Sequence, residues 1–185
     1  MQKYKIIAIM GKAGCGKDTL LKNVVSYMPH YFNALISCTT RPPRANEKEG
    51  RDYFFVTEEE FAAADLLEQT VFNNWHYGTA AHTLSPDKIN IGVFSPDGVR
   101  NLMERRDIEL ITIYLVANDK ARLLRQLNRE EQPNVYEIIR RFGTDEADFA
   151  DLSDITYTLL FNNSLEEFEA IVEYIANGLR AHWDN

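Results

Sequence analysis

A glycine-rich segment near the amino terminus carries the first residues that can do chemistry. Residues 11–17, Gly11-Lys12-Ala13-Gly14-Cys15-Gly16-Lys17, fit the pattern G-x-x-x-x-G-K between an apolar run and an amphipathic segment. In such a loop, glycines let backbone N–H groups close around phosphates, and the following helix points its positive end at them. The lysine reaches the terminal phosphate oxygens. The pattern predicts a binding site for a nucleoside triphosphate.

Asp18 follows the lysine at the position where this pattern has Ser or Thr, and Thr19 comes next. The Ser or Thr hydroxyl normally binds Mg²⁺, and a carboxylate is also a ligand that Mg²⁺ accepts. We therefore predict that Asp18 binds Mg²⁺, directly or through water. The alternative is that Asp18 only caps the helix and favours its dipole.

A second group of candidate residues lies in a segment rich in charge, proline and glycine, over residues 40–56. Arg41 and Arg44 flank the stiff pair Pro42-Pro43, and Tyr53 could add a hydroxyl donor. Two guanidinium groups held in this way suit bidentate capture of a phosphate monoester. The alternative is a solvated basic loop with no ligand.

The elements that must position these residues alternate between strands and helices. The run Tyr4–Met10 is continuously apolar, as in a strand that is buried on both faces of a parallel sheet. Thr57 and Glu60 form a capping box at the start of a helix. Strands are predicted at 4–10, 35–38, 89–95, 110–116 and 157–161, and helices at 18–28, from 58, at 96–106, 119–130, 135–149 and from 164 to about 183. This alternation predicts an α/β fold with a parallel sheet.

The composition excludes several functional classes. The net charge of −8 argues against a nucleic-acid polymer as partner, which needs a basic surface. Two cysteines make no disulfide framework, and four scattered histidines offer no zinc site. The apolar run after Lys5 ends at Gly11, too early for a signal peptide or a membrane span. We expect one cytoplasmic domain that binds no membrane.

The segment from Ser37 to Phe55 resembles the guanylate kinase family, whose pattern here is S-x-T-T-R-x-P-R-x-G-E-x-x-G-x-D-Y-x-F. The chain departs from it only at Asn46, which replaces a glycine. Glu68 precedes Tyr77-Gly78-Thr79 at the family's spacing, and Arg125, Arg129 and Arg141 match the family's lid arginines. The resemblance covers nearly the whole chain.

The resemblance implies ATP-dependent phosphoryl transfer to a nucleoside monophosphate, most simply GMP or dGMP. It implies a three-layer P-loop NTPase fold with a core (1–36, 81–124 and 142–185), a nucleoside-monophosphate-binding insert (37–80) and a lid (125–141). The acceptor would be held by Ser37, Arg41, Arg44, Tyr53, Glu68, Tyr77, Thr79 and Ser95, and ATP by Gly11 to Thr19, Arg125 and Asn162. Lys17, Arg41, Arg129 and Arg141 would promote transfer, with Mg²⁺ as cofactor.

Ser95 stands where the family has an acid near the guanine. The alternative functions are therefore a deoxynucleoside monophosphate kinase with another base preference, or a non-catalytic guanylate-kinase-like interaction module. The lid arginines could instead form a solvated helix face paired with Glu130, Glu131 and Glu137. Either a monomer or a homodimer is compatible with the sequence.

Overall fold

The core of the structure is a parallel sheet. The computed structural model describes residues 3–43, 47–72, 74–129 and 131–184. The strand order is β2 (Phe32–Ala34), β7 (Ile89–Val93), β1 (Tyr4–Met10), β8 (Ile108–Val116) and β9 (Thr158–Phe161). Every neighbouring pair is parallel. The α/β fold expected from the alternating pattern is confirmed.

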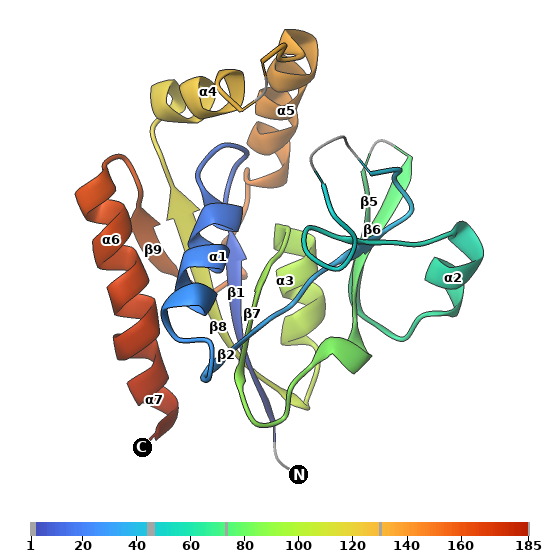
Figure 1. Ribbon diagram of the computed structural model, residues 1–185, viewed down its shortest axis with the longest axis vertical. Helices are drawn as coiled ribbons and strands as arrows, with labels where there is room; N and C mark the ends of the chain where they lie inside the picture. Colours follow the sequence, from blue (N-terminus) through green and yellow to red (C-terminus); the bar gives the residue numbers. More distant parts are fainter. Residues whose placement is uncertain (1–2, 44–46, 73, 130, 185) are drawn as a thin grey trace.

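Helices cover both faces of this sheet, which makes three layers (Figure 1). Ile7 and Ile9 of β1 pack in a cluster with α1 (Lys17–Tyr27) and α6 (Leu165–Glu173). Ile6, Ala8 and Met10 face the other way, toward α3 (Pro96–Met103). Because successive side chains of a strand point to opposite faces, β1 has to be apolar throughout.

A second sheet is formed within the segment between β2 and β7. Its order is β4 (Phe54–Phe55), β3 (Cys38–Thr39), β6 (Trp75–Ala80) and β5 (Leu66–Phe72). β3 pairs with β4 in parallel and with β6 antiparallel, and β5 and β6 form an antiparallel hairpin. With α2 (Glu58–Ala63), this sheet lies at the right of Figure 1, beside the core. The hairpin register places Glu68 directly opposite Thr79.

Side-chain caps set where most helices begin. Thr57 accepts from the Glu60 N–H while the Glu60 carboxylate accepts from the Thr57 N–H, so the predicted capping box is confirmed. Asn118 caps α4 (Asp119–Leu127) and Asn134 caps α5 (Val135–Asp148). Ser164 caps α6, which continues through a π-helical segment (Tyr174–Leu179) into α7 (Arg180–Asp184). Within the described ranges, no helix combines the length and the apolar character that a membrane crossing requires.

Some elements differ from those predicted, and β2 and the β5–β6 hairpin were not predicted at all. The strand predicted at 35–38 is instead the crossing between two sheets, with β2 ending at Ala34 and β3 starting at Cys38. The β5–β6 hairpin was not predicted, because its sequence mixes charges, asparagines and a glycine without a clean alternation. The helices predicted to reach Arg106 and Glu130 end at Met103 and Leu127. Glu130 itself lies outside the described residues.

Gly143, in the interior of α5, offers a test of this packing. A Cβ added there meets no atom within 4 Å, whereas one added at Gly92 in β7 would lie 2.8 Å from the Phe94 ring. Since glycine inside a helix costs about 0.5–1 kcal/mol relative to alanine, Gly143→Ala should raise the free energy of unfolding by that amount. Gly92→Ala, the control, should lower it. Urea denaturation measures both, and a destabilised Gly143→Ala would contradict the described position of α5.

Candidate active site

The phosphate loop joins the carboxyl end of β1 to the amino end of α1. Gly14 and Gly16 have φ angles of 79° and 103°, in the left-handed region that favours glycine. A Cβ on Gly14 would lie 2.6 Å from the Arg122 carbonyl oxygen, and one on Gly16 would lie 2.6 Å from Asn162 Nδ2. Gly16 is the N-cap of α1 and no side chain caps that helix. The first N–H groups of α1 are thus left for a ligand.

Lys17 lies folded over the loop. Its Nζ donates to the carbonyl oxygens of Gly11 at 2.6 Å and Lys12 at 3.2 Å. Cys15 is fully buried beneath the loop. The positive charge of Lys17, at the start of α1, is therefore held against the backbone of the loop.

Asp18 and Thr19 are exposed in the first turn of α1. The capping part of the alternative for Asp18 is wrong, since the N-cap is Gly16 and no side-chain cap is formed, but Asp18 does lie in the first turn, where a negative charge favours the helix dipole. No group of three potential protein metal ligands occurs in the described part of the chain. The binding of Mg²⁺ by Asp18 stays a prediction.

Two of the residues expected to bind ATP meet at the loop from distant parts of the chain. Asn162, just after β9, donates through Nδ2 to the Cys15 carbonyl oxygen at 2.8 Å. Arg125 of α4 donates to the carbonyl oxygens of Asn162 at 2.9 Å and Cys15 at 3.3 Å. The structure brings both to the turn that leads into α1.

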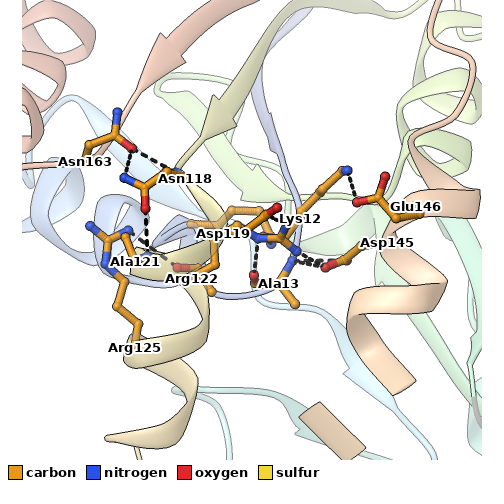
Figure 2. Close-up of polar contacts among 12 residues, drawn as sticks. Lys12, Ala13, Asn118, Asp119, Ala121, Arg122, Arg125, Asp145, Glu146 and Asn163 are labelled. Atoms are coloured by element: carbon orange, nitrogen blue, oxygen red, sulfur yellow. Dashed lines mark hydrogen bonds and ion pairs between the residues drawn. The ribbon is translucent and has the colours of Figure 1, made fainter. Parts of the chain in front are cut away.

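Two further residues at the loop were missed by the sequence reasoning. Arg122 of α4 and Asp145 of α5 form an ion pair, and both contact Ala13 (Figure 2). They belong to no short motif, and a separation of 23 residues hides the pairing.

Arg41 is the central residue of the second predicted phosphate-binding group. It is only 9% exposed, and Nη2 donates to both carboxylate oxygens of Glu47 at 2.9 Å. Burial alone would lower the pKa of Arg41, but the hydrogen bond and charge of Glu47 raise it, with help from Tyr77. The guanidinium also lies over the Tyr53 ring, 5.4 Å from its centre. Arg44, the other predicted arginine, lies outside the described residues.

The second pocket adjoins the phosphate loop. Lys22 of α1 bonds to Asp52 at 3.0 Å, which ties the core helix to the insert. Burial, followed by the nearby charge of Asp18, raises the pKa of Tyr53 to about 12. Tyr53 packs edge to face on Tyr77 with ring centres 5.9 Å apart. The two phosphate-binding groups predicted from the sequence therefore lie side by side.

A buried polar cluster lies deeper in the insert. Thr79 donates to Glu68 Oε1 at 2.8 Å, and the Ser37 hydroxyl lies 3.4 Å from that of Thr79. Burial raises the pKa of the Glu68 carboxyl, against the hydrogen bonds from Thr79. Glu68 Oε2 lies 3.0 Å from where a Cβ on Gly98 would be, at the start of α3. Ser95 caps that helix by accepting from the Gly98 N–H at 3.1 Å.

Of the arginines expected in the lid, Arg125 reaches the phosphate loop, whereas Arg141 is held by a carboxylate of its own helix in this conformation. Arg141 Nε donates to Glu137 at 2.9 Å within α5, and Arg140 makes a bidentate pair with the same carboxylate. Arg129 is exposed just after α4. In this conformation Arg141 forms the ion pair with Glu137 that the alternative expects, and Glu130 lies outside the described residues.

The Glu137 cluster predicts a pH-dependent contribution to stability. Arg140, then Arg141, lowers the pKa of Glu137 from 4.5 to about 2. When folding lowers the pKa of a carboxyl group, the ionised group stabilises the folded protein at pH values above the pKa of the unfolded state. This stabilisation is lost as the pH falls toward the pKa of the folded state. Glu137→Gln should therefore be less stable than wild type at neutral pH, and the difference should shrink between pH 4.5 and about 2. Urea midpoints across that range measure it; a constant difference would contradict the assignment.

Comparisons with known proteins agree with this geometry. The sequence model of the guanylate kinase family matches residues 3–180. A guanylate kinase of Malacoplasma penetrans is 35% identical over 172 residues, covering 83% of this chain and 87% of that protein. Guanylate kinase of Homo sapiens is 28% identical, covering 87% and 86%. The crystal structure of guanylate kinase from Anaplasma phagocytophilum shares the fold, with a TM-score of 0.65 at 23% identity over 98% of this chain and 88% of that one. The chain belongs to the guanylate kinase family.

Proposed function

We propose that this protein transfers the terminal phosphoryl group of ATP to GMP or dGMP, giving GDP or dGDP. The observation that carries the proposal is the contact between the segment with Arg41, Asp52 and Tyr53 and the helix that follows the phosphate loop. An ion pair between Lys22 of α1 and Asp52 of the insert, at 3.0 Å, connects the two regions. Phosphoryl transfer depends chiefly on positioning and charge stabilisation, so two adjacent phosphate sites provide what the reaction requires.

The donor is held by the phosphate loop. Backbone N–H groups from Gly14 to Thr19 would bind the phosphates, and Lys17 would exchange its loop carbonyls for phosphate oxygens. Arg125 and Asn162 lie beside the loop, where they would contact the part of ATP beyond its phosphates.

The residues at the loop fit Mg²⁺ bound together with ATP. In the described part of the chain, no hydrogen bond or ion pair engages the exposed Asp18 carboxylate. Mg²⁺ commonly binds one or two carboxylates together with substrate phosphates and water. Bound there, it would neutralise charge on the phosphates; Asp18 would hold it.

The acceptor occupies the insert, residues 37–80. Ser37, Arg41, Arg44, Tyr53 and Tyr77 would bind its phosphate, displacing Glu47 as the partner of Arg41. Glu68 would accept from the adjacent N1–H and N2–H₂ groups of guanine. Thr79 would turn its hydroxyl proton away from Glu68 Oε1 and donate it to O6. A buried carboxylate rejects bases that leave it unpaired, so this pocket provides base selectivity.

The lid, residues 125–141, would close over the transferring group. Arg129 and Arg141 are the residues that we propose to stabilise its charge, and Arg141 must then leave Glu137. The division into core, insert and lid is supported by the separate sheet formed between Cys38 and Ala80. Closure would exclude water and limit hydrolysis of ATP.

A coupled assay with ATP and each ribo- and deoxynucleoside monophosphate tests the activity. Lys17→Ala and Arg41→Ala should each lower kcat/KM by about 100- to 1,000-fold, because each removes a positive group aimed at phosphate. Circular dichroism confirms that the fold is kept, and Lys88→Ala, at an exposed contact with the Pro29 carbonyl, is the control. Full activity in either site variant would contradict the site. No transfer to any acceptor by the wild type would favour the non-catalytic module.

Glu68→Gln tests how the base is recognised. The amide keeps the size of the side chain and an oxygen for Thr79, but it loses the charge and one acceptor. The preference for guanine over other bases should fall by about 1–3 kcal/mol, the cost of an unpaired buried group. The ratio of kcat/KM values across the monophosphates measures it. An unchanged ratio would refute the role of Glu68, and a different preferred base in the wild type would point to the deoxynucleotide alternative.

A further inference from the structure

The phosphate loop is held from outside by a buried ion pair. Arg122 of α4 is 2% exposed and Asp145 of α5 is 9% exposed, and Arg122 Nη2 donates to Asp145 Oδ2. The Arg122 guanidinium also lies over the Phe142 ring, 4.3 Å from its centre. A buried charge is costly unless it is paired and fully hydrogen-bonded, so neither residue can lose the other without consequence.

This pair engages both backbone groups of one residue in the loop. The Ala13 N–H donates to Asp145 at 2.9 and 3.1 Å, and the Ala13 carbonyl oxygen accepts from Arg122 Nε at 2.9 Å. Figure 2 shows Ala13 between the two side chains. The peptide just before Gly14 is thereby fixed in direction, and with it the N–H groups that follow.

Further contacts of these residues and their neighbours connect the loop to both α4 and α5. Arg122 also donates to Asp119 at 2.7 Å within α4, while Lys12 next to Ala13 pairs with Glu146 of α5. The Arg122 carbonyl oxygen lies against Gly14. The loop, α4 and α5 therefore form one connected unit, and α5 is the helix that carries Arg141.

We propose that Asp145 is a positioning residue for the donor nucleotide: with Arg122 it holds the Ala13 peptide so that the phosphate loop keeps its binding shape and stays attached to α5. The inference rests on the proposed function only in taking ATP as the ligand of the loop. Asp145 touches no substrate and acts through the Ala13 N–H and through Arg122.

The test compares ATP affinity with stability. Calorimetric titration with ATP and Mg²⁺ should show that Asp145→Asn raises the Kd by about tenfold or more, since a small misplacement of positioning groups is costly. The KM for GMP should stay within about twofold, giving a selective effect on the donor. Asp107→Asn is the matched control, because it breaks a half-buried arginine–aspartate pair with Arg105.

A double variant, Arg122→Met with Asp145→Leu, separates positioning from packing. Apolar replacement of a buried ion pair is often neutral or stabilising, so the urea midpoint should return toward the wild-type value. The Ala13 N–H and carbonyl would still lack their partners, and the Kd for ATP should stay raised. This variant decides the question if Asp145→Asn does not fold.

Two results would overturn the inference. One is an Asp145→Asn protein that folds and binds ATP as tightly as wild type; the other is a double variant in which affinity recovers together with stability. Failure of the proposed function gives a different result, namely a wild type that binds ATP but transfers no phosphoryl group to GMP. The comparison of ATP affinities remains valid in that case.

Discussion

Everything at the site depends on one constraint in the backbone: the loop between β1 and α1 must turn its N–H groups inward. The chain meets it with Gly14 and Gly16 at positive φ, pressed so closely against Arg122 and Asn162 that a Cβ at either would lie 2.6 Å from an atom of the neighbour. The loop is therefore shaped from outside as well as by its own sequence. β1, which is buried on both faces, gives this turn a fixed base.

The same core also positions the acceptor pocket. The crossing from β2 to β3 passes through Leu35, whose N–H donates to the Ile91 carbonyl oxygen of β7 at 2.8 Å, so the second sheet begins from a fixed point. Glu68 of that sheet packs against Gly98 at the start of α3. This close approach is possible because Gly98 has no side chain. The predicted base site thus lies between the second sheet and the start of α3. Its selectivity depends on how the insert sits on the core.

The sequence predicts elements that are encoded by local patterns, such as apolar strands, helix caps and the phosphate loop. Apolar runs located four of the five core strands but not β2, and the capping box located the start of α2. The pattern G-x-x-x-x-G-K located the loop between β1 and α1. The hairpin that sets Glu68 opposite Thr79 was missed, because its pairing depends on tertiary packing rather than on a period in its residues. The contact of Arg122 and Asp145 with Ala13 was missed for a similar reason. Buried ion pairs between helices leave no local signature.

The proposed reaction requires the phosphate loop and the residues around Arg41 to hold a donor and an acceptor phosphate next to each other. The most direct measurement is calorimetric titration with a bisubstrate compound, adenosine and guanosine joined through a pentaphosphate chain. If the two pockets lie side by side as described, it should bind one to one and at least about 100-fold more tightly than ATP or GMP alone, because linking turns the second binding event into an intramolecular one. Affinity no better than that of the tighter mononucleotide would contradict the account.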